Sequence, residues 1–389
     1  MEQLHGRARL AHKYIHVTIT RFQTHFPDLS THTIHSHSHI SRMLRHNYTV
    51  VLIQIQHNCF LRDKGKQYQR NGKGGLFRMV TFHVQLVDMA TGANHSLCTT
   101  LPTIFTPIRM PFFIFTSGGL LYLSRIRREW TTRALYADKL RRIAIPFVFF
   151  VTFYYLFKLL AGTWAKTPVP LSLSYYAECF YRFTGHPSAH LWFLATLLML
   201  MALYPLFVAV CRNHTASVAM LLFSVGIYHA GLESVLPDVF YINHLHRYLV
   251  YFYFGIFFFR YRLYRFTDSP LVAVAAVAVY AASYCVVGGL ATSIAGIVMC
   301  VAVGQSVARR LPGLFCSFRD YIYQIYLMSM FFQAFVELVL WKRLFYDERL
   351  FLVFYALNIL AGIYLPTLVA RLAQRQPYRL VRLCLGIKA

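Results

Sequence analysis

Apolar residues are grouped along most of the chain into blocks that are long enough to cross a lipid bilayer. A membrane helix needs roughly 20 apolar residues, and in lipid it must pair its own backbone polar groups. Nine segments meet this requirement: about 102–123, 143–161, 190–210, 216–235, 247–264, 270–289, 290–308, 320–341 and 349–371. The apolar stretch 270–308 is too long for one crossing, so we divide it at Gly288-Gly289.

A tenth, weaker segment precedes these nine. It covers about 78–97 and contains His83, Asp88, Asn94 and His95. A central Asp costs about 2.5–3.5 kcal/mol on insertion, so this segment crosses only if its polar face lines the protein interior. We therefore predict an all-α fold: a polytopic membrane helix bundle of about ten transmembrane helices, nine of them clear and the first weak.

Loops rich in Lys and Arg alternate with loops that contain few. The loop after segment 102–123 holds a basic cluster: Arg125, Arg127, Arg128, Arg133, Lys139, Arg141 and Arg142. The next loop, 162–189, holds only Lys166 and Arg182 over a greater length. Because basic loops stay in the cytoplasm, we expect loop 124–142 and the C-terminus inside and loop 162–189 outside.

Composition supports one membrane domain. Of the 389 residues, 57% are hydrophobic and 14% are charged, against about 25% charged in a typical soluble protein. The net charge of +25 fits cytoplasmic loops that contact anionic membrane lipid. No zinc-finger spacing or RNA-binding signature is present, so we expect no nucleic-acid partner. The eight cysteines are scattered, and we interpret them as structural thiols with no metal site.

The two ends of the chain differ from this domain. Residues 1–77 contain ten histidines and three acidic residues, and we interpret them as a His-rich cytoplasmic tail that is disordered or non-native. Its run His35-Ser36-His37-Ser38-His39 leaves transition-metal binding as an alternative. We expect the transmembrane domain over 78–371 and a basic cytoplasmic tail over 372–389.

Polar groups at membrane depth are the candidates for chemistry because they are costly to keep there. In the first clear segment, Arg109 and Thr116 share a helix face, Pro111 bends the helix, and Ser117-Gly118 follows. Such a helix can line a polar cleft that holds a fixed cation. The alternative is an ordinary kinked helix whose Arg109 extends toward the membrane surface and whose Ser-Gly face packs.

A histidine is the natural general base, since its pKa lies near neutrality. His95 sits near the expected external end of the weak first segment. Four other histidines at expected external positions compete with it: His186, His190, His244 and His246.

Several motifs, in order, resemble acyltransferase family 3, the ten-helix membrane enzymes that O-acylate bacterial surface glycans and some other acceptors. His95-Ser96 followed by the run from Arg109 to Gly118 resembles the opening of the family. The run Lys139 to Pro146 resembles its basic loop and early helix proline, and His190-Leu191-Trp192-Phe193-Leu194 resembles its aromatic motif. Two weaker patterns follow, Phe252 to Gly255 and Tyr321 to Leu327, so the likeness covers about 92–389.

This resemblance implies a catalytic His95 with Arg109 nearby and a substrate site that includes Ser117, Gly118, Trp192 and Phe193. It also implies an acyl-CoA co-substrate, most simply acetyl-CoA, that is reached from the cytoplasm. Arg141 and Arg142 would hold the donor phosphates, although their cytoplasmic position explains them equally. No other cofactor and no metal are expected.

We therefore expect a bacterial inner-membrane O-acyltransferase that acts on a hydroxyl of a glycan or lipid-linked sugar. A transporter or flippase is one alternative, but it would show internal repeats. A membrane glycosyltransferase would need acidic residues in the first external loop, and residues 97–102 have none. An inactive family member is the third alternative, since Val84 occupies the position where the family has an arginine before its histidine.

Overall fold

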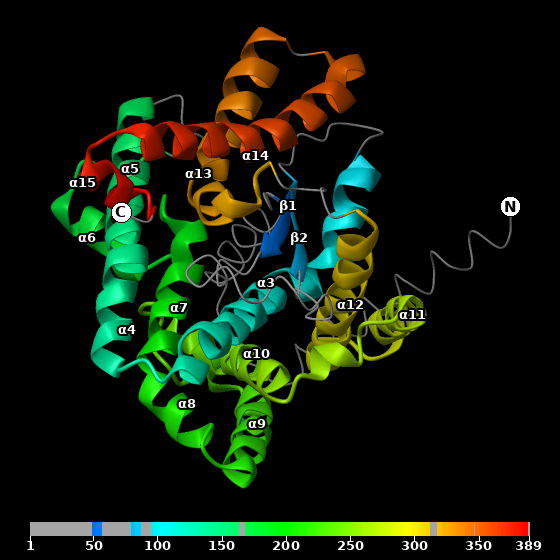
Figure 1. Cartoon of the computed structure of the whole chain (residues 1–389). Coiled ribbons are helices and arrows are strands. Elements are labelled where there is room, and N and C mark those ends of the chain that lie inside the picture. Colours follow the sequence, from blue (N-terminus) through cyan, green and yellow to red (C-terminus); the bar gives the residue numbers. More distant parts are fainter. Residues whose placement is uncertain are drawn as a thin grey trace, which may run out of the picture. The chain divides into compact units, whose positions relative to one another are not determined.

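The computed structural model describes residues 49–56, 79–86, 95–162, 168–311, 317–345 and 347–387. Two strands, β1 (Thr49–Gln56) and β2 (Met79–Leu86), precede the helices. The helices are α3 (His95–Ser124), α4 (Thr132–Lys139), α5 (Ile145–Ala161), α6 (Leu173–Tyr181), α7 (Trp192–Ala202), α8 (Tyr204–Val210), α9 (His214–His229), α10 (Ile242–Arg260), α11 (Pro270–Val286), α12 (Gly289–Arg310), α13 (Ile322–Phe335), α14 (Phe351–Arg375) and α15 (Arg379–Cys384) (Figure 1). The expected His-rich tail lies outside the described residues, apart from β1.

The all-α prediction is confirmed for the membrane domain, and each of the nine clear segments is helical. Within the described residues, five helical segments are long and apolar enough to cross a membrane, and the bent pair formed by Ala189–Ala202 and Tyr204–Val210 would make a sixth. The division of the long apolar stretch is also confirmed, because α11 ends at Val286 and α12 begins at Gly289. Gly288 and Gly289 have φ values of 72° and 60°, which favour glycine at this turn.

The weak first helix is wrong over most of its length. Residues 79–86 form β2, which pairs antiparallel with β1 in the register Val51 to Val84. The sequence of β2 alternates apolar and polar residues, with a repeat of two, and alternation of this kind suits a strand. The prediction of a helix over 78–97 used only segment length and hydropathy, so it did not detect this two-residue repeat. Helical structure begins only at His95.

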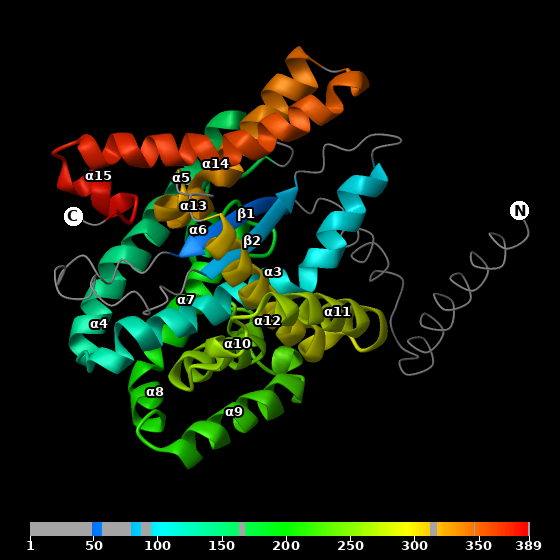
Figure 2. The same ribbon diagram turned by 45° about the vertical axis from the view of Figure 1, so that its right-hand side comes forward.

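The core of the bundle is the crossing of α3 and α10, which lie side by side in both views (Figures 1 and 2). A Cβ on Gly118 would lie 2.0 Å from the carbonyl oxygen of Phe252, and one on Gly255 would lie 2.0 Å from that of Phe115. The two backbones therefore meet directly, as small residues allow in membrane helix pairs. Phe115 is fully buried here, and its ring lies 5.3 Å from that of Phe258.

Three hydrogen bonds join other elements of the bundle to one another. The Tyr204 hydroxyl of α8 donates to the Trp130 carbonyl at 2.7 Å, and the Tyr154 hydroxyl of α5 donates to the Leu327 carbonyl at 2.9 Å. At the C-terminal end, Gln324 of α13 donates to the Leu385 carbonyl at 3.0 Å. The expected basic tail therefore packs against the bundle from α15 onward, with Ile387 buried.

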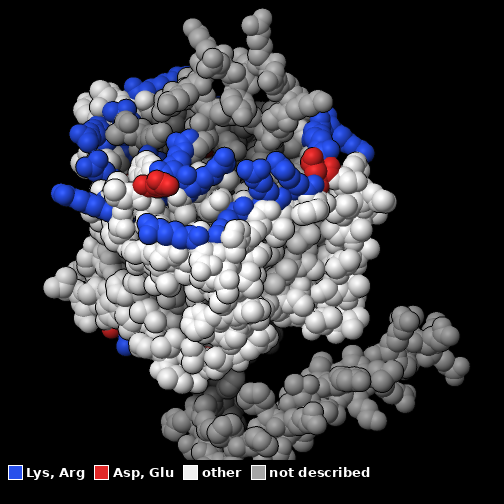
Figure 3. Space-filling model, turned by 60° about the horizontal axis from the view of Figure 1, so that its bottom comes forward, with Lys and Arg blue, Asp and Glu red and all other residues white. Residues whose placement is uncertain are grey.

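Lys and Arg side chains gather in one band on the face shown in Figure 3, with few acidic groups among them. Most exposed arginines of the described chain lie in the loops and helix ends that the sequence marks as basic: Arg127, Arg128, Arg133, Arg141, Arg212, Arg262, Arg265, Arg309, Arg310, Arg371, Arg375 and Arg379. Arg182, Arg247 and Arg349 are exposed elsewhere. Much of the rest of this face is uncharged (Figure 3), as a lipid-facing surface requires.

Candidate active site

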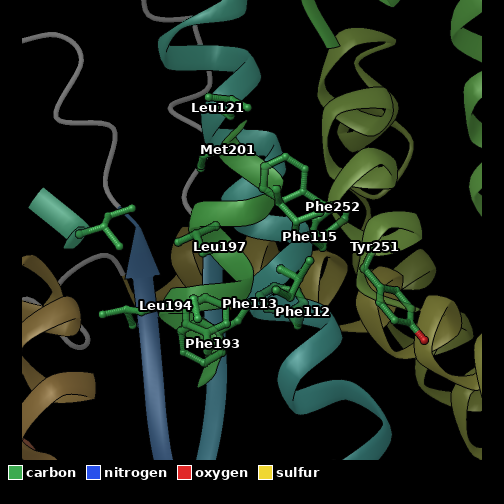
Figure 4. Close-up of a cluster of buried hydrophobic side chains, with 14 of the residues drawn as sticks. Phe112, Phe113, Phe115, Leu121, Phe193, Leu194, Leu197, Met201, Tyr251 and Phe252 are labelled. Atoms are coloured by element: carbon green, nitrogen blue, oxygen red, sulfur yellow. The ribbon is translucent and has the colours of Figure 1, made fainter. Parts of the chain in front are cut away.

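The segment that enters α7 is where side chains from four other helices meet. A short 3₁₀ turn, Ala189–Leu191, leads directly into α7 at Trp192. The Phe193 ring packs edge-on against Phe113 of α3 at 5.8 Å and against Tyr326 of α13 at 5.5 Å. Figure 4 shows Phe113 and Phe193 together in the buried cluster. The predicted substrate residue Phe193 is therefore a buried packing residue at this junction.

Trp192 faces α10 instead. Its ring centroid lies 4.7 Å from that of Tyr241 and 5.1 Å from that of Tyr248, with tilts of 32° and 31°. Arg109 of α3 is half-buried, and its charge acts on Tyr248. Two residues predicted from separate motifs, Arg109 and Trp192, are thus linked through one tyrosine that sequence reasoning missed.

His190 lies at the same junction, on the side of α5 and α13. The Tyr154 ring approaches its imidazole edge-on at 4.4 Å, and the Tyr326 hydroxyl donates to its carbonyl at 2.5 Å. The imidazole Nε2 atom is buried and has no hydrogen-bond partner among the described residues. A buried polar atom of this kind needs an explanation, and a bound substrate would supply a partner.

Ser117 and Gly118 lie two turns further along α3. The Ser117 hydroxyl donates to the Phe113 carbonyl of its own helix at 2.8 Å, and Thr116 donates to the same carbonyl at 2.9 Å. Gly118 contacts the α10 backbone. In the structure, these residues support the α3–α10 crossing, which agrees with the packing alternative for the Ser-Gly face.

His95 and Arg109 both lie on α3 but far apart along it. His95 is the first residue of α3, and its side chain lies outside the described part. Arg109 follows by fourteen positions, so the rise of an ideal helix separates their Cα atoms by about 21 Å along the axis. Bends at the prolines within α3 would shorten this distance.

Arg141 and Arg142 occupy the π-helical segment Leu140–Ala144 between α4 and α5. Arg142 pairs through Nε with Asp138 Oδ1 at 2.8 Å, and Arg125 pairs with the other oxygen of the same carboxylate at 2.9 Å. Arg125 also covers the Trp130 ring at 3.4 Å. Arg142 therefore shares the single negative charge of Asp138 with Arg125, while Arg141 is exposed.

Of the other competing histidines, His244 lies with its ring 4.5 Å from that of Tyr241, and His186 and His246 each lie near a glutamate. The two ring nitrogens of His246, like Nε2 of His190, have no hydrogen-bond partner among the described residues. His186 Nε2 lies 3.7 Å from Glu178 Oε2, and His186 Nδ1 lies 3.7 Å from the Cys179 thiol. Burial lowers the pKa of His186, although Glu178 opposes the shift. His246 is buried, with its Nε2 atom 3.4 Å from Glu233 Oε1. His186 and His246 do not approach the Trp192 junction through a described contact, whereas His244 reaches it through Tyr241.

Taken together, the apolar spans and this polar, aromatic junction between helices define a multi-pass membrane protein with a candidate site at the start of α7. Comparison with known families agrees. The family model of the acyltransferase domain matches residues 75–371, which is most of the chain. The chain therefore belongs to acyltransferase family 3, as its motifs indicate, and it is a membrane acyltransferase. No curated protein and no solved structure matches it in the other two searches.

Proposed function

We propose that the protein transfers an acyl group, most simply acetyl, from acyl-CoA on the cytoplasmic side to a hydroxyl of a glycan or lipid-linked sugar. The acyltransferase domain supports the reaction type. The observation that carries the proposal is the junction at α7, where Trp192 of the family's aromatic motif packs against Tyr248, on which the charge of the half-buried Arg109 acts. An apolar site with a few polar groups is the usual form of a small-molecule site.

In the proposed reaction, His95 accepts the proton of the acceptor hydroxyl as its oxygen attacks the thioester carbonyl carbon. The carbon–sulfur bond then breaks, and the CoA thiolate takes the proton back from the imidazolium. The products are an ester and free CoA. Arg109 would orient the thioester and stabilise the developing negative charge.

Other residues would bind the two substrates. Trp192 and Phe193 would form the apolar wall, and Ser117 and Gly118 would hold α3 close to α10 behind it. Arg141, which is exposed, would bind the donor phosphates. Arg142 would also bind them by releasing Asp138 and pairing with a phosphate in its place. The proposed location is the bacterial inner membrane, with the C-terminus in the cytoplasm, because the basic loops would then face inward.

The test is transfer of radiolabel from acetyl-CoA to a surface glycan fraction in membranes with matched expression. The wild type is compared with His95→Ala, with His190→Ala and with His229→Ala, a matched control at the exposed end of α9. We expect label with the wild type and control and a loss of at least about 100-fold with His95→Ala, the usual size of a general-base contribution.

The other outcomes separate the alternatives. Full activity in His95→Ala with loss in His190→Ala would move the base to the imidazole with the unpartnered Nε2 atom. If the wild type consumes no acetyl-CoA, the proposed donor is wrong.

A further inference from the structure

Four aromatic side chains gather where α7 and α10 begin, and we call them the Trp192 platform: Trp192, Tyr241, His244 and Tyr248. Tyr241 and His244 lie with their rings 4.5 Å apart, and Tyr241 and Tyr248 are stacked at 6.4 Å with an angle of 24°. His244 and Tyr248 are four residues apart and share a face of α10, and Tyr241 is the residue that precedes this helix. The platform therefore joins the first turns of α10 to the first residue of α7.

The rings of Trp192, Tyr241 and Tyr248 lie together as a triangle, with centroid separations of 4.7 Å, 5.1 Å and 6.4 Å. Their mutual tilts of 32°, 31° and 24° show that the three ring planes are inclined to one another by similar small angles.

The platform differs from the aromatic core of the bundle. Its four members are all half-buried, whereas core rings such as Phe115 and Phe252 are fully buried. Among the described residues, the hydroxyls of Tyr241 and Tyr248 have no hydrogen-bond partner. Core tyrosines such as Tyr253 and Tyr154 do have partners. Aromatic faces with unused polar edges are typical of a binding surface.

The backbone that presents Tyr241 is strained. Phe240 and Tyr241 have φ values of 52° and 62°, in the left-handed region that residues with a Cβ rarely adopt. Phe240 is held there by donating its N–H to the Tyr181 carbonyl at 2.8 Å. Conformations of this kind cost about 1–3 kcal/mol each and persist mainly at functional sites. A purely structural aromatic contact would not need two strained residues in succession.

We infer that the Trp192 platform binds one pyranose ring of the acceptor. A pyranose offers an apolar C–H face to the electron-rich face of an aromatic ring and hydroxyls to the polar edges around it. This assignment rests on the proposed function for its place in the reaction, because Arg109 of the proposed site acts electrostatically on Tyr248 of the platform.

Charge favours a neutral sugar over the adenosine phosphates of CoA. The acidic groups that act on Tyr241 and His244 are Asp238 and Glu233. Arg247 opposes them, but it already pairs with Glu233. A set of three phosphates would need more unpaired cations than this surface offers.

The experiment uses the full chain in lipid nanodiscs prepared without sugar-headed detergent. Tryptophan fluorescence is titrated with three methyl glycosides, those of glucose, mannose and rhamnose. In parallel, acetyl-CoA consumption is followed through release of free thiol. Trp192→Phe should remove the fluorescence change, and Trp341→Phe, which alters a buried tryptophan in the π-helical segment after α13, should keep it.

Tyr248→Leu should weaken binding of the preferred glycoside about tenfold, corresponding to about 1.4 kcal/mol. Tyr248→Phe, which keeps the ring, should weaken glycoside binding less than Tyr248→Leu does. Tyr241→Asn should also weaken binding, and Asn tolerates the left-handed backbone, so loss of the ring is tested without added strain. These variants should raise the acceptor KM more than they lower the maximal rate of acetyl-CoA consumption.

The outcomes separate this inference from the proposed function. If no glycoside binds although acetyl-CoA is consumed, the platform is not a sugar site and the proposed donor stands. If CoA produces the Trp192 signal in place of the sugars, the platform belongs to the donor and the inference is overturned. If the glycosides bind through the platform but acetyl-CoA is not consumed, the sugar site stands and the proposed donor is wrong.

Discussion

Gly118 is the position where a single methyl group tests the α3–α10 crossing. In Gly118→Ala the new Cβ would lie 2.0 Å from the Phe252 carbonyl oxygen. Ordinary contact begins at 3.4 Å, so the helices must separate by about 1.4 Å. The oxygen belongs to helical backbone and cannot rotate away, as the end of a side chain could.

The magnitude follows from two opposing terms. Overpacking costs about 1–3 kcal/mol, and a backbone clash belongs at the upper end of that range. Replacing glycine by alanine inside a helix returns about 1 kcal/mol through helix propensity. We therefore expect Gly118→Ala to lose about 2 kcal/mol of stability. Gly226→Ala on α9 is the matched control. Its new Cβ meets no atom within 4 Å, so the substitution gains helix propensity and causes no clash.

The assay is thermal unfolding of the purified full chain, followed by the loss of monodisperse protein on size exclusion. Gly118→Ala should unfold several degrees below the wild type and Gly226→Ala at or above it. Gly255→Ala clashes with the Phe115 carbonyl across the same crossing, so the double variant should lose less than the sum of the single losses. Equal midpoints for Gly118→Ala and Gly226→Ala would refute the direct backbone contact.

Three smaller perturbations use the same assay. Asp138→Asn should cost about 1–3 kcal/mol because it leaves the largely buried Arg125 without its carboxylate, and a neutral result would mean that the pair is solvated. Tyr204→Phe should cost about 1 kcal/mol, since the Trp130 carbonyl loses its donor; no loss would argue against that bond. The lowered pKa of His186 means that the unfolded chain binds its proton more readily, so stability should fall as pH drops below about 6.5. His186→Gln should flatten that acid slope, and an unchanged slope would assign it to other groups.

Much of the membrane architecture was predictable because length and apolarity have a direct physical meaning in lipid. The nine clear segments are helices, and Gly288-Gly289 separates two of them as predicted. The region around β2 was predicted wrongly because its mixed composition concealed a repeat of two residues.

The candidate site was predictable only in part. Arg109 and Trp192 stood out as a costly cation and a motif aromatic, and the structure links them. Tyr248, Tyr241 and Tyr154 were missed, since 27 tyrosines in the chain give no local sign of which ones meet. Tyr326 lies within the quoted pattern Tyr321 to Leu327 but was not named as a site residue. Ser117 remains a predicted substrate residue, yet its hydroxyl is bonded within α3.

By itself, the sequence determined that this chain crosses the membrane repeatedly, where its helices lie and which chemistry its motifs resemble. These properties depend on composition and on local order along the chain. Only the tertiary structure decided that Gly118 faces the α10 backbone, that Asp138 holds two arginines, and that Trp192 packs against two tyrosines at the start of α10. Such contacts depend on how helices distant in sequence are rotated and spaced against one another, and packing sets both.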